Sequence, residues 1–150
     1  MSIRVVARAL GTVEEAQRQD FMAIVRAGGE VSDASLGRNT REAERLVFAR
    51  QGGSLVGVAA LKNPQPHHRA TIKQKAGVAV EVMDFPFELG YIFVLPCARR
   101  GGLATKLCRS ALRAANGRGV FATARTDNVG IHRILRRLRF QKVGIPFSST

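Results

Sequence analysis

The N-terminal part of the chain has the apolar spacing of a strand followed by a helix. Apolar and polar residues alternate weakly over residues 3–9, as they do in a half-buried strand. Thr12, with Glu15 after it, matches a capping box and predicts a helix start. Apolar residues then recur at helical spacing, and Gly28–Gly29 is a typical helix end. We therefore expect a strand and then an amphipathic helix.

A hairpin and two polar stretches follow. Residues 46–50 and 55–61 are apolar runs joined by a glycine-containing turn, which predicts two antiparallel strands. Residues 29–39 are small and polar and are predicted to form a loop, with a short helix at 40–44. Residues 63–84 contain prolines, two adjacent histidines and a basic run, and we also expect a loop there.

The second half of the chain alternates between strands and helices. Strands are predicted at 88–95 and 119–124. An amphipathic helix over 103–115 follows the first, and a helix that opens at Asp127–Asn128 follows the second. This order predicts an α/β sheet with at least one parallel pair. No repeat or linker interrupts the chain, so we expect a single domain over residues 1–150.

The turn between the strand at 88–95 and the next helix has the features of an anion-binding site. It reads Arg-Arg-Gly-Gly-Leu-Ala over residues 99–104. Glycines allow backbone N–H groups to approach an anion closely, and a helix start supplies unpaired donors and a positive dipole end. Arginines add positive charge. The turn is therefore predicted to bind phosphate.

The order Arg-x-x-Gly-x-Ala after a Val-x-Pro strand end resembles the acyl-CoA-binding signature of the GNAT superfamily of N-acyltransferases. The later part of the chain is also similar to the family pattern, with Asn128 opening a helix and Leu138-Arg-Phe140 followed by Val143-Gly144. The resemblance covers about residues 44–147. It implies a mixed, mostly antiparallel central sheet with a splayed parallel strand pair and helices on both faces.

The resemblance also implies where acetyl-CoA, or coenzyme A, would bind. Pantetheine would lie between the splayed strands and pair with the backbone of the first one, and donors of this kind stabilise an oxyanion by roughly 3 kcal/mol each. The glycine turn would hold the pyrophosphate, and Asn128 would face the cofactor arm, cap its helix, or do both. The implied cofactor-binding residues are Ile92, Phe93, Val94, Arg99, Arg100, Gly101, Gly102, Leu103, Ala104, Thr105 and Asn128.

The catalytic groups follow the family pattern less closely. Members usually have a Tyr acid where this chain has Leu135, and the Gly of Leu-Gly-Phe is Arg139 here. Glu88 is the candidate general base, and strand alternation places it on the face of Ile92 and Val94. A strand-end surface charge is the alternative for Glu88. Tyr91 is expected on the face of Leu89 and Phe93, as a core or sheet-surface residue.

Composition and charge limit the possible ligands of the protein and its cellular location. The chain has 150 residues, 45% of them apolar, and a net charge of +13. Residues 97–150 contain twelve Lys and Arg residues and one acidic residue, Asp127, which gives a net charge of +11. This charge either attracts a polyanion such as RNA or belongs to a basic surface that only contacts solvent. No membrane segment or metal-ligand spacing is present, and we expect a cytoplasmic protein without metal. Cys97 and Cys108 are expected to be small buried residues.

Three functions are consistent with the sequence. The first is an acyl-CoA-dependent N-acyltransferase, with acetyl-CoA as the expected donor, that acts by direct transfer to a primary amine. The second is a narrower form that acetylates an RNA-linked amine, such as that of an aminoacyl-tRNA. The third is a catalytically impaired GNAT-like protein that binds coenzyme A or a polyanion. The chain also stops short of the family's usual final strand, which leaves an open sheet edge or a homodimer.

Overall fold

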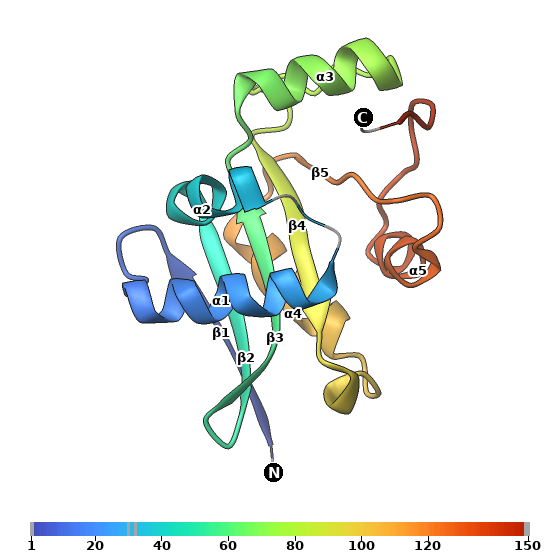
Figure 1. The fold of residues 1–150 in the computed structure, drawn as a ribbon. Coiled ribbons are helices and arrows are strands. Elements are labelled where there is room, and N and C mark those ends of the chain that lie inside the picture. The colour runs from blue at the N-terminus through green and yellow to red at the C-terminus, as the bar shows by residue number, and fades with distance from the viewer. Residues whose placement is uncertain (1, 30, 32, 149–150) are drawn as a thin grey trace.

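A five-stranded sheet forms the centre of the molecule (Figure 1). The computed structural model describes residues 2–29, 31 and 33–148. The strands follow chain order across the sheet, and β1 to β4 pair antiparallel whereas β4 and β5 pair parallel. Their bounds are β1 Ile3–Ala9, β2 Arg45–Gln51, β3 Ser54–Lys62, β4 Phe87–Val94 and β5 Val120–Phe121. The predicted mixed, mostly antiparallel sheet with one parallel pair is confirmed.

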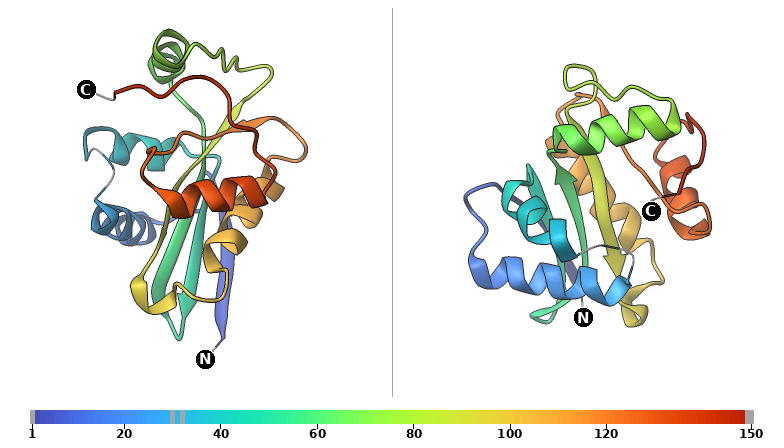
Figure 2. Two further views of the ribbon diagram at one scale, coloured as in Figure 1. Left: turned by 90° about the vertical axis from the view of Figure 1, so that its right-hand side faces the viewer. Right: turned by 45° about the horizontal axis from the view of Figure 1, so that its top comes forward.

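Helices cover both faces of this sheet. α1 and α2 lie on one face and α4 on the other, while α3 crosses the end of the sheet where β4 begins (Figure 1). α5 stands beside the edge that carries β5 (Figure 2, left). The bounds are α1 Glu15–Gly28, α2 Asp33–Glu42, α3 Pro66–Ala76, α4 Leu103–Ala114 and α5 Val129–Arg137, with a 3₁₀ turn η1 at Pro96–Ala98. None of the described helices is long and apolar enough to cross a bilayer.

Each face of the sheet buries its own apolar core. On the α4 face, Leu107, Cys108 and Ala111 of the helix are fully buried against strand residues such as Val47 and Leu89. On the other face, α1 and α2 bury a second cluster around Phe21 and Leu36. Alternation along β2 and β3 supplies both cores, because successive side chains point to opposite faces.

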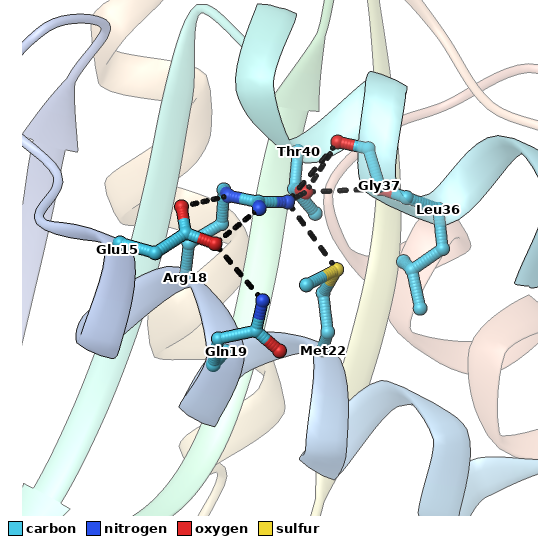
Figure 3. Close-up of polar contacts among 7 residues, drawn as sticks. All are labelled: Glu15, Arg18, Gln19, Met22, Leu36, Gly37 and Thr40. Atoms are coloured by element: carbon cyan, nitrogen blue, oxygen red, sulfur yellow. Dashed lines mark hydrogen bonds and ion pairs between the residues drawn. The ribbon is translucent and has the colours of Figure 1, made fainter.

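A buried arginine joins α1 to α2 (Figure 3). Arg18 pairs with Glu15 one turn earlier and donates to the Gly37 carbonyl and to Thr40 Oγ1, both at 3.2 Å. Its guanidinium also contacts Met22 Sδ at 3.5 Å. Because these groups satisfy most of its donors, the charge is buried with partners, and the two helices are held as one layer.

The strands of the first half are where the sequence predicts them, but the helices differ. Thr12 is not the cap of α1, because its hydroxyl donates to the Ala9 carbonyl at 2.6 Å and Glu14 caps the helix in a box with Gln17. The predicted end at Gly29, with φ of 72°, is confirmed. The expected loop at 29–39 and short helix at 40–44 are wrong, since α2 already begins at Asp33.

Two further elements of the second half differ from the expectation. The predicted loop at 63–84 contains α3, which starts with Pro66 in its first turn, where a missing N–H costs nothing. The strand predicted at 119–124 is reduced to the two residues of β5. The described C-terminal residues run back to α3, where Ile145 N–H donates to the Ala76 carbonyl at 3.0 Å.

Candidate active site

β4 contains a bulge that changes which face its side chains occupy. Val58 pairs with Phe93 and Ala60 with Gly90, so Tyr91 and Ile92 together face a single β3 residue. Tyr91 has a φ of 52°, which is unusual for a residue with a side chain. As a result Tyr91 packs in the core under α1 and α2, whereas Leu89 packs under α4. The expectation that Tyr91 and Leu89 share a face is wrong.

The same bulge reverses the expected position of Glu88. Glu88 is the cross-strand partner of Lys62 and lies on the face of Tyr91, opposite to Ile92 and Val94. The expectation that Glu88 shares a face with those two residues is wrong, because an extra residue inverts the alternation on one side of it.

β4 and β5 diverge directly after Glu88. Their pairing consists of Phe87 with Val120 and Glu88 with Phe121. Within the part of the chain that the structure describes, no strand pairs with residues 89–94 on the β5 side. The N–H and C=O groups of this edge that point away from β3 can therefore pair with an extended ligand, except that the Val94 carbonyl already accepts a hydrogen bond from Arg99 Nε.

The turn after β4 leads into an uncapped helix start. Arg99 Nε donates to the Val94 carbonyl at 2.9 Å, and its guanidinium lies over the Phe93 ring, so the arginine fixes the strand end. Gly101 and Gly102 have φ of 109° and 75°, which strongly favour glycine. Gly102 is the N-cap of α4 and offers no side-chain acceptor to it.

The first amides of α4 remain available as donors. Among the described residues, the N–H groups of Leu103, Ala104 and Thr105 have no backbone or side-chain acceptor, and the first bond of the helix runs from Lys106 to Gly102. The side chains of Leu103 and Thr105 are buried, whereas Arg100 is exposed. Free amides, two glycines and an exposed arginine together form a cradle that fits a phosphate.

Asn128 has a structural role in the site. Its Oδ1 accepts a hydrogen bond from the Ile131 amide at 3.1 Å and so caps α5, as predicted. On the same helix Leu135, at the position of the expected tyrosine, is half-buried against the α4-side core. Arg139 follows the helix with a φ of 69°, a backbone conformation that suits the glycine of the family pattern.

Glu88 lies in a polar cluster at the point where β4 and β5 diverge. Its Oε1 is 3.2 Å from Lys62 Nζ and 3.1 Å from His68 Nε2. Its Oε2 is 3.2 Å from His68 Nε2 and accepts a hydrogen bond from Thr123 Oγ1 at 3.3 Å. Four elements or their ends thus meet at one carboxylate: β3, α3, β4 and the segment after β5.

The cluster keeps Glu88 ionised. Burial by itself would raise the pKa of this carboxyl, since its side chain is only 2% exposed. The hydrogen bond with His68 and the charge of Lys62 outweigh burial, so the pKa of Glu88 lies below its ordinary value. A carboxylate of this kind is a weak proton acceptor by itself, and its access to a substrate depends on its neighbours.

The sequence points to Glu88 and shows the His67–His68 pair, but it does not predict that Lys62, His68 and Thr123 contact Glu88. The pairing of Lys62 with Glu88 follows from the register of β3 and β4, which the bulge shifts. His68 belongs to a helix that the sequence pattern does not show, and Thr123 to a segment for which the pattern predicts strand. Of the two cysteines, Cys108 is buried as predicted, whereas Cys97 is exposed and that expectation is wrong.

The fold and this arrangement define a class. The open edge of β4, the glycine turn and the helix start without a side-chain cap agree with the resemblance of the sequence to the GNAT acyltransferases. The Acetyltransferase (GNAT) family model matches residues 13–140, and the chain belongs to this family. It is therefore an N-acetyltransferase by family, with acetyl-CoA as acyl donor. No curated protein matches the chain.

Solved structures agree with the fold. An aminoglycoside acetyltransferase, AAC(6')-Iy, in complex with a bisubstrate analogue has a TM-score of 0.68 at 17% identity, over 100% of this chain and 98% of that chain. The apo enzyme AAC(6')-IG from Acinetobacter haemolyticus has a TM-score of 0.62 at 23% identity, over 100% and 99%. A ribosomal-protein-alanine N-acetyltransferase from Brucella melitensis has a TM-score of 0.62 at 15% identity, over 100% and 97%.

Proposed function

We propose that this chain transfers an acetyl group from acetyl-CoA directly to a primary amine, and that the donor lies along the open edge of β4. The observation that carries the proposal is the set of unpaired amides at the start of α4, next to Gly101 and Gly102. Bound there, acetyl-CoA supplies an activated thioester carbonyl. The residues of the site bind and orient the donor and accept the proton of the amine.

The dimensions of β4 support this placement. The phosphate cradle lies beyond Val94 at one end of the strand, and the ionised Glu88 lies at the other end. Six residues of strand separate them by about 20 Å. An extended pantetheine arm along Ile92, Phe93 and Val94 would run from the cradle toward the Glu88 cluster. Backbone amides at the bulge would then be close to the thioester, where developing negative charge needs donors.

The carboxylate of Glu88 is the centre of the polar cluster that we propose handles the proton of the acceptor amine. It is held by Lys62 and His68 and is ionised, so it can take part in removing the ammonium proton of the acceptor. Leu135 cannot supply an acid, and we infer that the departing sulfur takes its proton from solvent. We expect turnover to be slower for that reason, by roughly 10²–10⁴-fold relative to an enzyme with a placed acid.

Charge favours an acidic carrier of the amine as a second, narrower candidate. The net charge of +11 over residues 97–150 belongs to the same part of the chain as the phosphate cradle. This field attracts polyanions and disfavours polycationic acceptors, so an RNA-linked amine is a better fit than a free polyamine. Retention of the protein on RNA that weakens steeply with salt supports this candidate, and a slope near zero removes it.

The test of donor binding uses a pair of matched variants. Gly102→Asp places a carboxylate among the free amides of α4, and Gly117→Asp places the same charge beyond the other end of the helix. Both glycines have positive φ, 75° and 82°, and open space around them, so the backbone strain is comparable. We expect Gly102→Asp alone to abolish binding of acetyl-CoA, as measured by calorimetry.

Thermal unfolding gives a second readout. A ligand at 100 times its dissociation constant stabilises a protein by roughly 2.7 kcal/mol, so acetyl-CoA should raise the melting temperature of the unmodified chain and of Gly117→Asp. Release of thiol with a panel of a polyamine, an aminoglycoside, N-terminal peptides and an aminoacyl-RNA then separates turnover from binding. Binding without thiol release from any amine would support the impaired, binding-only alternative.

A further inference from the structure

We propose that His68 is the group that accepts the proton of the acceptor amine, and that Glu88 is a positioning residue that orients its ring. The inference rests on the proposed function and goes beyond it. It assigns the proton transfer to a side chain of α3, outside the strands and the glycine turn that form the donor site.

The contacts of His68 fix which ring nitrogen can accept a proton. Nε2 lies 3.1 Å and 3.2 Å from the two oxygens of Glu88. An ionised carboxylate is only an acceptor, so the neutral ring must carry its hydrogen on Nε2 and donate it to Glu88. Nδ1 is then left with a lone pair. This is the same relation that a buried carboxylate has to the histidine of a Ser-His-Asp triad.

The surroundings keep Glu88 in the required ionised form. Lys62 Nζ on β3 lies 3.2 Å from Oε1, and Thr123 donates to Oε2. Lys62 also lies 4.5 Å from the Tyr91 ring, which limits its movement. Another cation beside the cluster is Arg69 on α3, which faces Phe121 and donates to backbone carbonyls of residues 80–86.

The two candidate bases, Glu88 and His68, differ in the solvent exposure of their side chains. The side chain of Glu88 is 2% exposed, whereas that of His68 is 40% exposed. The His68 ring stacks on Phe121, with centroids 6.4 Å apart and an interplanar angle of 28°, and so faces the point where β4 and β5 diverge. An acceptor amine can reach His68, directly or through one water, without opening the core.

The proton transfer balances without a further reactant. The N–H bond of the acceptor ammonium breaks and an N–H bond forms at His68 Nδ1, while the electron pair stays on the amine nitrogen. The amine is then neutral and nucleophilic. The imidazolium that results lies against the Glu88 carboxylate, which stabilises its charge, and the exposed ring edge returns the proton to solvent.

The kinetic test compares two adjacent histidines. His68→Gln removes the base and keeps a polar side chain of similar size, and His67→Gln is the matched control at an exposed position of the same helix. With an amine from the panel above, we expect His68→Gln to lower kcat/KM at least 10²-fold and to abolish the acidic limb of its pH profile. Acetyl-CoA binding should be unchanged in both variants. His68→Gln with the activity and pH profile of His67→Gln overturns the inference.

A spectroscopic test needs no acceptor. The ¹⁵N shifts of the neutral His68 ring report its tautomer, and we expect the hydrogen on Nε2 in the unmodified chain and a mixture of tautomers in Glu88→Gln. A ring with its hydrogen on Nδ1 overturns the inference, whichever amines are accepted. The two proposals fail separately: loss of acetyl-CoA binding and of all thiol release would refute the transferase, whereas turnover that is indifferent to His68 would refute only the proton acceptor.

Discussion

The ion pair of Lys62 with Glu88 allows a stability prediction that tests the centre of the proposed site. Lys62→Met keeps the length and apolar stem of the side chain but removes its charge. Glu88 then stays buried with His68 and Thr123 as its remaining partners. We expect this single change to destabilise the protein, because a carboxylate that is 2% exposed loses its permanent counter-charge.

The size of the effect follows from the geometry. At the separation of 3.2 Å between Lys62 Nζ and Glu88 Oε1, the attraction is about 5 kcal/mol at an effective dielectric constant of about 20. Burying Lys62, whose side chain is 16% exposed, offsets part of this gain. Removing one partner of a buried pair typically costs about 3–5 kcal/mol, and because His68 remains we expect about 3 kcal/mol.

The pH dependence has a definite sign. The pKa of Glu88 is lowered in the folded protein, so its contribution to stability is complete above the ordinary value of 4.5 and is lost as pH falls through the folded value. Lys62→Met moves that pKa upward, because Lys62 is one cause of the lowering. The difference in stability between the two proteins should therefore be largest at neutral pH and should shrink in acid.

Urea unfolding followed by circular dichroism measures these differences, since the chain contains no tryptophan. Lys142→Met, at an exposed position, is the control for loss of one positive charge. The double variant Lys62→Met with Glu88→Gln removes both charges and should recover at least half of the lost stability. A loss below about 1 kcal/mol for Lys62→Met, equal at pH 7 and in acid, would refute the reasoning.

Three further predictions concern single positions. A Cβ at Gly119 would lie 2.0 Å from the Asp84 carbonyl oxygen, so Gly119→Ala should cost about 3 kcal/mol in urea unfolding, and a neutral effect would contradict the packing at the start of β5. Arg139→Gly should be stabilising by up to about 1 kcal/mol, because φ is 69° there; a loss of stability would show that the Arg139 side chain matters more than its backbone. Burial raises the pKa of Cys108 to about 12, whereas Cys97 is exposed, so mass spectrometry should find one iodoacetamide adduct on the native protein, at Cys97, and modification of Cys108 without unfolding would argue against its burial.

Periodicity predicts the sheet well because β2 and β3 are buried on both faces and paired on both sides. Their apolar runs at 46–50 and 55–61 leave few alternatives to a central hairpin. Helix α3 is not predicted from the sequence, for the opposite reason. Ile72 is its only described residue that is fully buried, and Pro66 reads as a break although the first turn of a helix accepts it. An almost wholly polar helix has no apolar stripe to detect.

The bulge in β4 limits what any alternation argument can establish. A period of two assigns faces correctly on each side of Tyr91, but the extra residue reverses the assignment across it. In the sequence Gly90-Tyr91-Ile92, the only sign of the bulge is a glycine within a strand. Such a glycine can equally mark the close approach of another backbone or of a ligand. Alternation therefore points to Glu88 as a candidate base but assigns it the wrong neighbours.

The two parts of the proposed site differ in how they are encoded, and only one of them is readable from the sequence. The phosphate cradle is local: the two glycines, the arginines and the first amides of α4 occupy consecutive positions, so their chemistry follows from their order. The proton-accepting cluster is assembled from positions 62, 68, 88 and 123, which only the register of β3 with β4 and the placement of α3 bring together. In the proposed site, the family signature therefore indicates how the donor would be held, whereas the proposed base lies on α3, outside that signature. This chain keeps the glycine turn and the free amides of α4 although Leu135 stands where the family pattern has its acid, so the two parts of the site vary separately here.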